Sequence, residues 1–184
     1  MTPAENDYSD LLVRYMPYRR YFEVGFWVLN FILIVCINFV IVTLDLERAQ
    51  LDFESWKPFV WELSSNLTSL CLVPAVIYFS NRFPLHFGVL RKHVPIHILG
   101  SIVFSVMHVS GMVAIRKLVY ASQGGHYDFG NWPVELCYEY LKDWQTYAGI
   151  LFVLALYRLL LLRLQGEARM LDIPDDGPEL EPVQ

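Results

Sequence analysis

The sequence has 184 residues, 55% of them hydrophobic, and a net charge of −5 at pH 7. An ordinary soluble domain has an apolar share of about 45–50%, so the composition argues against that class. The negative charge argues against a nucleic-acid-binding surface, and the three cysteines form no CxxC motif and predict no disulfide framework.

Residues 1–23 are polar and contain no small-residue cleavage site. The hydrophobic stretch that follows is therefore expected to be retained as a helix and not removed with a signal peptide. An amphipathic segment at the membrane interface, interrupted by Pro17, and a partly ordered tail fit these first residues equally well.

Residues 24–163 are predicted to form the membrane domain. They contain four stretches with almost no charge, each near the roughly 20 residues that a helix needs to cross the hydrocarbon core. These stretches are residues 24–44, 63–81, 94–115 and 144–162. Residues 118–143 are predicted to be the longest loop, and residues 164–184 a juxtamembrane helix followed by a disordered, acidic, proline-containing linker. The predicted fold class is all-α: an integral membrane protein built as a four-helix transmembrane bundle.

The distribution of lysine and arginine predicts the orientation of this bundle. The N-terminal segment, the second loop and the C-terminal segment together hold nine of these residues, against five in the first and third loops. Positive residues accumulate on the cytoplasmic side of membrane proteins. Both termini are therefore expected to be cytoplasmic.

A polar stripe marks the third predicted span. His97, Ser101, Ser105 and His108 are spaced 4, 4 and 3 residues apart, which places them on one face of a helix. Polar groups are costly when they face lipid, so this face is expected to point into the bundle.

A candidate ligand or signal cluster is predicted in the outer half of the bundle, from the depth of polar residues at about 1.5 Å of rise per residue. It comprises His108, Asn38, Asn66, Ser69 and Tyr147. A secondary polar stripe comprises His97, Ser101, Ser105 and Glu62. The alternative is that these residues only form interhelical hydrogen bonds, worth about 0.6 kcal/mol each.

No catalytic, metal or cofactor site is expected, and the chain is not expected to be an enzyme. His97 and His108 are about 16 Å apart along a helix axis, too far for one metal ion with bonds near 2.1 Å. The other histidines lie in predicted loops, which disfavours a haem held between spans, and no acid is expected at the depth of Ser101 and Ser105. His97 is expected to bond a backbone carbonyl or a lipid headgroup.

Two segments carry a resemblance to a known family: the residues PAVIYFSNRFP at 74–84 and HILGSIVFSVMH at 97–108. Together they resemble the four-helix membrane sensor region of bacterial LytTR-type transcriptional regulators. Similar regions precede the kinase core of LytS/AlgZ-like sensor histidine kinases, and the motifs do not separate the two families. The resemblance covers about residues 20–165.

The resemblance implies signalling in the bacterial inner membrane, in response to an unknown small-molecule or membrane-derived signal. It implies a homodimer, with DNA bound only through a C-terminal output domain that this chain lacks. The leading hypothesis is therefore a sensory or regulatory membrane domain. The alternatives are a membrane anchor that sequesters a separate regulator, the sensor region of a histidine kinase, and a small redox or haem-binding membrane protein.

Overall fold

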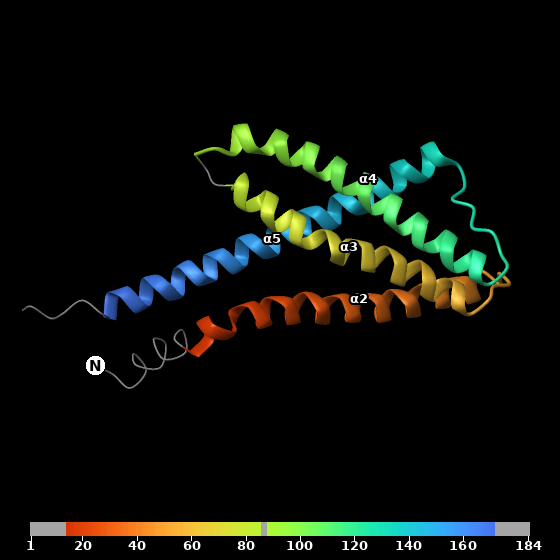
Figure 1. Cartoon of the computed structure of the whole chain (residues 1–184), viewed down its shortest axis with the longest axis horizontal. Coiled ribbons are helices and arrows are strands. Elements are labelled where there is room, and N and C mark those ends of the chain that lie inside the picture. The colour runs from red at the N-terminus through yellow and green to blue at the C-terminus, as the bar shows by residue number, and fades with distance from the viewer. Residues whose placement is uncertain (1–13, 86–87, 172–184) are drawn as a thin grey trace, which may run out of the picture. The chain divides into compact units, whose positions relative to one another are not determined.

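The computed structural model describes residues 14–85 and 88–171, and all regular secondary structure in that part of the chain is helical. A short 3₁₀ helix, η1 (Met16–Tyr18), precedes four long α-helices (Figure 1). These are α2 (Arg19–Arg48), α3 (Trp56–Arg82), α4 (Leu90–Ser122) and α5 (Trp132–Leu171). All four are long and apolar enough to cross a membrane. The predictions of an all-helical chain and of four helices of spanning length are confirmed.

The chain divides into two compact units. The main unit is Val24–Val153, and the terminal unit combines the two ends of the chain, of which residues 14–23 and 154–171 are described. The predicted linker at 172–184 and most of the predicted N-terminal segment lie outside the described residues.

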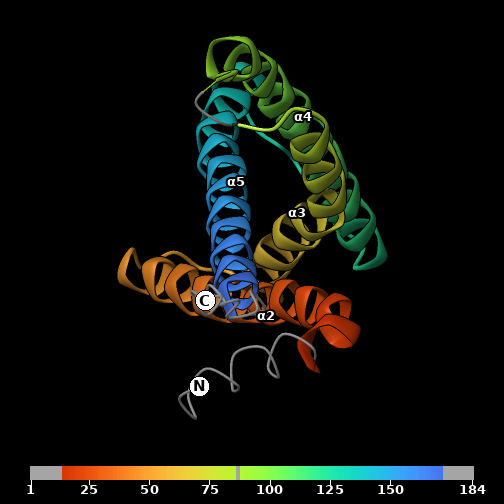
Figure 2. The ribbon, with the colours of Figure 1, turned by 90° about the vertical axis from the view of Figure 1, so that its left-hand side faces the viewer.

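The core of the main unit is the antiparallel pair of α3 and α4, which lie side by side in both views (Figures 1 and 2). The polar stripe of α4 faces inward: each of its four side chains is at most 5% exposed. Two glycines of α4 allow the close approach. A Cβ atom added at Gly111 would lie 2.7 Å from Cγ2 of Thr68, and one added at Gly100 would lie 2.8 Å from the ring of Phe79. Small residues permit such contacts between membrane helices.

The predicted third loop is shorter than the charge pattern suggested. Helix α4 continues to Ser122 and α5 begins at Trp132, so residues 123–131 form the connection. Pro133 stands in the first turn of α5, where a missing N–H costs nothing. Phe129 and Tyr127 of the connection pack on Val109, Met112 and Val113 of α4. This small apolar core fixes the connection against the helix.

Arg116 holds the same end of α4 against α3. Its guanidinium donates to Oγ of Ser64 at 3.0 Å, to the carbonyl oxygen of Trp61 at 3.0 Å and to the hydroxyl of Tyr127 at 2.9 Å. Each of the three guanidinium nitrogens thus donates one hydrogen bond, and a charge inside a long apolar helix is tolerated when it has polar partners of this kind.

Helix α2 differs from α3 and α4 because Val35 is its one buried residue among those described. Residues 24–44 of α2 carry no charge, and Phe39 makes an edge-to-face ring contact with Phe59 of α3 at 5.9 Å. An uncharged and largely exposed helix of this length suits a lipid environment.

In the terminal unit, Tyr157 of α5 is the centre of a hydrogen-bond network with the start of α2. Its hydroxyl donates to Oε1 of Glu23 at 2.8 Å and accepts from Nε of Arg19 at 3.1 Å. Arg19 also pairs with Glu23 at 2.8 Å, and the hydroxyl of Tyr15 lies 2.9 Å from that of Tyr157. The network ties the first turns of α2 to α5.

Candidate functional site

Three helices of the main unit meet at His108. Helix α4 supplies His108 and Ser105, α3 supplies Ser65, and α5 supplies Glu139 and Asp143. We call these five residues the His108 cluster. His108, Glu139 and Asp143 are 2%, 6% and 2% exposed, so two carboxyl groups and an imidazole are withdrawn from solvent together.

The contacts of His108 determine which ring nitrogen carries the proton. Nε2 lies 3.0 Å from the carbonyl oxygen of Ser65 and 3.2 Å from its Oγ. A carbonyl oxygen can only accept, so Nε2 carries a hydrogen and Nδ1 is the nitrogen that faces α5. Nδ1 lies 2.8 Å from Oδ1 of Asp143, yet it has no hydrogen-bond partner among the described residues because the alignment does not suit one.

The two carboxylates are held by other side chains. Oγ of Ser105 donates to Oδ2 of Asp143 at 2.6 Å. Nζ of Lys142 donates to both carboxylate oxygens of Glu139, at 3.2 and 3.1 Å. Glu139 and Asp143 are four residues apart on α5 and therefore share a face, which points at α4.

The expectation that no acid lies at the depth of the α4 serines is wrong. Asp143 bonds Ser105 directly, as described above. The charge-free stretch 144–162 leaves Asp143 and Glu139 in a predicted loop, whereas α5 begins at Trp132. The spacing of Glu135, Glu139 and Asp143, four residues each, carried the signal, because it places three acids on one helical face.

The five residues of the predicted ligand cluster do not form one network. Tyr147 bonds His97, and the ring of Phe104 lies between Tyr147 and His108, with centroids 5.7 and 6.2 Å away. Nδ2 of Asn66 donates to the carbonyl oxygen of Glu62 on its own helix at 2.9 Å. Among the described residues, no hydrogen bond joins Asn38 or Ser69 to His108. The candidate site therefore keeps His108 and gains the residues of α5.

His97 forms a separate buried site at the other end of the stripe. Its Nε2–H donates to the carbonyl oxygen of Phe83, the C-cap of α3, at 2.8 Å. Nδ1 must then accept the hydroxyl hydrogen of Tyr147, at 2.9 Å. The expectation that His97 bonds a backbone carbonyl is confirmed. Ser101 bonds the carbonyl oxygen of Ile98 on its own helix at 2.7 Å.

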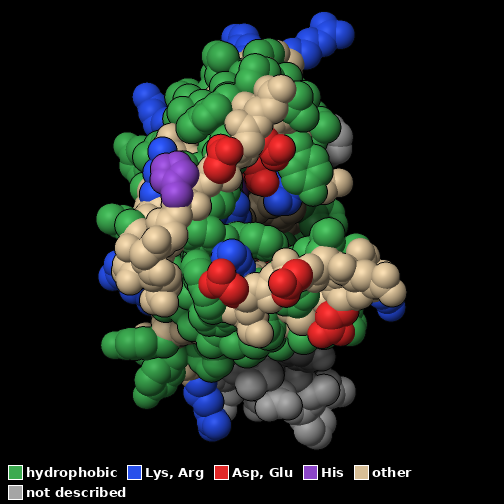
Figure 3. Space-filling model, turned by 90° about the vertical axis from the view of Figure 1, so that its right-hand side faces the viewer, with side chains coloured by type: hydrophobic (Ala, Val, Ile, Leu, Met, Phe, Trp, Pro, Cys, Tyr) green, Lys and Arg blue, Asp and Glu red, His purple; other side chains and the backbone are tan. Residues whose placement is uncertain are grey.

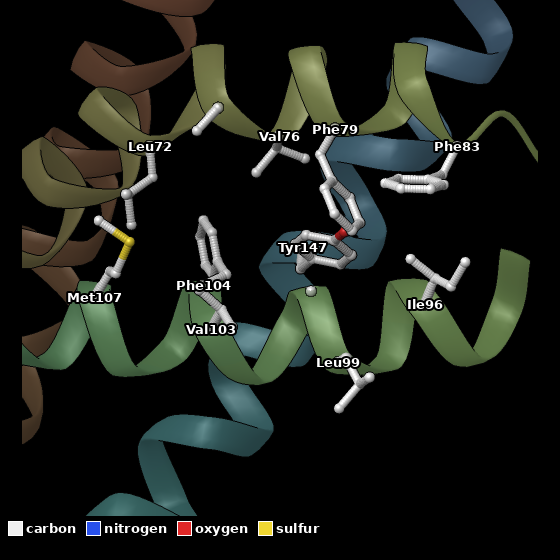
Figure 4. Close-up of a pocket in the computed structure, with 12 residues that line it drawn as sticks. Leu72, Val76, Phe79, Phe83, Ile96, Leu99, Val103, Phe104, Met107 and Tyr147 are labelled. Carbon is white, nitrogen blue, oxygen red and sulfur yellow. The ribbon is translucent and has the colours of Figure 1, made fainter.

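An apolar cavity of about 360 Å³ lies beside His97, between α3 and α4 (Figure 4). Phe79, Phe83 and Phe104 form its aromatic wall, and the side chain of Tyr147 reaches it from α5. Leu99, Val103 and Met107 line it from α4 and are also exposed, so the cavity opens sideways between the two helices. A cavity with this lining favours an apolar occupant over water.

The order Ser65, His108, Asp143 resembles the order of a hydrolytic triad, but the hydrogen bonds oppose that chemistry. In a triad the nitrogen facing the serine must accept the hydroxyl proton. Here the carbonyl oxygen of Ser65 lies 3.0 Å from Nε2 and requires a hydrogen on it. The serine hydroxyl at 3.2 Å consequently has no base in this arrangement.

Comparison with known proteins identifies no relative of this chain. No family model, no curated protein and no solved structure matches the chain.

Proposed function

We propose that the chain is the membrane-embedded sensory or regulatory domain of a bacterial signalling protein. It forms a four-helix bundle in the inner membrane, with both termini in the cytoplasm, and acts as a homodimer. Its output is a DNA-binding domain of the LytTR type that follows the C-terminal end. The sequence motifs at 74–84 and 97–108 support this family assignment.

The observation that carries the proposal is the position of the two buried acids on α5. Asp143 contacts Ser105 and His108 of α4, and Glu139 lies beside them with its carboxylate held by Lys142. The same helix continues to Leu171. Buried ionisable groups are expensive in a membrane protein and mark functional sites more often than packing sites. A signal that changes the charge or occupancy of the cluster changes the free energy of docking α5 on α4. A continuous helix then carries that change toward the C-terminal end.

We expect replacement of His108 to alter signalling output without removing the protein from the membrane. The test is a chimera in which a dimerisation-dependent DNA-binding reporter follows Gln184, assayed across changes in divalent cations, osmolarity and membrane stress. His108→Asn keeps a polar side chain but alters the contacts to Ser65 and Asp143, and should change the response at least several-fold. His126→Asn, in the exposed α4–α5 connection, is the matched control and should behave as the wild type.

Equal output from the wild type and His108→Asn under every condition, at equal membrane levels, would contradict the proposal. The comparison of levels by membrane fractionation separates a signalling defect from loss of the protein.

The orientation gives a second expected result. A cytoplasm-active fluorescent reporter fused after Gln184 should be bright, and a periplasm-active phosphatase at the same position should be inactive. The same pair inserted at Asp52, in the connection between α2 and α3, should give the opposite pattern. Phosphatase activity at Gln184 would reverse the proposed topology.

A further inference from the structure

The buried Nδ1 of His108 is the starting point. The imidazole is 2% exposed and its Nε2 is committed to Ser65, so Nδ1 is the ring nitrogen that faces the carboxylates of α5. A lone pair that faces a carboxylate oxygen at 2.8 Å is repulsive unless a positive charge lies between them. A shared proton would be one such charge, but it would align as an N–H···O bond, and Nδ1 makes none.

The charge of the cluster also suits a bound cation. Two carboxylates are buried, and Lys142 compensates the one on Glu139. Asp143 has the hydroxyl of Ser105 on Oδ2 and Nδ1 of His108 near Oδ1. An ionised carboxylate withdrawn from water without a compensating positive charge is strongly unfavourable.

We propose that His108, Glu139 and Asp143 bind a divalent transition-metal ion of the Mn²⁺-to-Zn²⁺ series. One ligand atom from each residue lies within 4.8 Å of those of the other two. Bonds of about 2.1 Å hold neighbouring ligands of a tetrahedral ion about 3.4 Å apart, so small side-chain rotations close the site. One imidazole nitrogen with two carboxylate oxygens suits these ions and does not suit soft ions such as Cu⁺.

The surrounding contacts are those that orient metal ligands in other proteins. A metal-binding histidine usually donates its second N–H to a backbone carbonyl, which fixes the tautomer, and the carbonyl of Ser65 occupies that position here. Ser105 holds Oδ2 of Asp143 and leaves Oδ1 for the ion. Two carboxylates and one dication make the site neutral, which lowers the cost of burying it.

Lys142 is the group that a metal ion must displace. Its ammonium contacts both oxygens of Glu139, and its side chain is 48% exposed. The lysine can therefore move into solvent when the ion takes a Glu139 oxygen. Acidic and basic side chains both lie around a hollow at the end of the main unit where the α2–α3 and α4–α5 connections lie (Figure 3).

The site deepens the proposed function, because a dissociable ion at this position would be the signal, and that role rests on the proposal above. The metal site itself does not depend on the output domain. Metal binding that leaves reporter output unchanged would reject the function and keep the site. A reporter that depends on His108 in a protein without metal affinity would reject the site and keep the function.

The test uses the full chain, purified in detergent, stripped with a chelator and titrated separately with Zn²⁺ and Mn²⁺ by calorimetry. We expect one ion per chain and a rise in the thermal midpoint on addition of the ion. His108→Gln and Asp143→Asn should weaken binding at least 100-fold, and Ser105→Ala, which leaves all three ligands in place, about 10-fold. Co²⁺ loading should give visible d–d absorption bands that His108→Gln changes.

The matched control is His126→Gln with Asp52→Asn, both exposed residues of connections, which should keep the wild-type affinity. Size-exclusion profiles show whether each variant is folded, and Ser105→Ala keeps the test valid if the ligand variants aggregate. Wild-type protein that binds neither ion, or that binds no more tightly than His108→Gln and Ser105→Ala, overturns the proposal.

Discussion

Replacing Asp143 with alanine is expected to destabilise the chain more than any other single truncation in the His108 cluster. The change removes the acceptor of the 2.6 Å hydrogen bond from Ser105 and the carboxylate 2.8 Å from Nδ1 of His108. It leaves a buried hydroxyl and a buried imidazole facing a new cavity. A buried donor left without its acceptor costs about 1–3 kcal/mol, and the new cavity adds to that cost. The measurement is the thermal midpoint of the detergent-solubilised protein, followed by tryptophan fluorescence or size exclusion.

Two further variants separate the charge of Asp143 from its shape and from the general effect of losing an acid. Asp143→Asn keeps an oxygen for the Ser105 hydroxyl and should lose less stability than the alanine variant. Asp52→Ala removes an exposed acid of the α2–α3 connection and should leave the thermal midpoint unchanged. Equal midpoints for Asp143→Ala and Asp52→Ala would show that the buried cluster does not hold α5 in place.

The helices were predictable because their dominant signal is local. About 20 uncharged residues can cross the hydrocarbon core only as a helix, and each predicted span lies inside an observed one. The inward face of α4 followed equally directly, because a helical period of 3.6 residues puts His97, Ser101, Ser105 and His108 on one side. The burial of that face could be predicted without knowing which helices pack against it.

The composition of the site was not predictable in the same way, because it depends on how three helices are rotated about their axes. Depth along a span can be counted, and it predicts that residues of all four spans meet near His108, whereas the described contacts there come from α3, α4 and α5. Depth does not say which side of a helix faces a neighbour. Tyr147 and His108 were assigned to one cluster on depth, but the ring of Phe104 separates them and Tyr147 bonds His97.

Glu139 and Asp143 are absent from the predicted site for a different reason. A window that ends a span at the first charge assumes that charges face water. Asp143 and Glu139 instead face α4, with Ser105 and Lys142 as partners, so α5 extends past them toward Trp132. A paired acid in an apolar helix is indistinguishable from a loop acid by hydropathy, whereas its four-residue spacing from the next acid does distinguish it.

The closest contact between α3 and α4 leads to the last expected result. Gly111→Ala places a methyl group 2.7 Å from Cγ2 of Thr68, a buried residue whose hydroxyl donates to the carbonyl oxygen of Ser64 at 2.8 Å. Thr68 cannot turn away without breaking that bond, so the helices must separate. Overpacking of this kind costs about 1–3 kcal/mol. The measurement is again the thermal midpoint of the purified protein.

A double-mutant cycle with Thr68→Ser decides whether that contact is the cause. Serine removes Cγ2 and keeps the hydroxyl, after which the nearest atom to the new methyl group is Oγ at 3.3 Å. The double variant should therefore recover most of the stability that Gly111→Ala loses. Gly149→Ala is the control, because nothing lies within 4 Å of the added carbon. It should gain only the intrinsic helix propensity of alanine over glycine, about 1 kcal/mol, and the stabilities of Gly111→Ala and of the double variant are compared with it. Equal thermal midpoints for Gly111→Ala and Gly149→Ala would mean that α3 and α4 separate at no cost. The close packing of α3 on α4 would then not be what positions His108 beside Ser65.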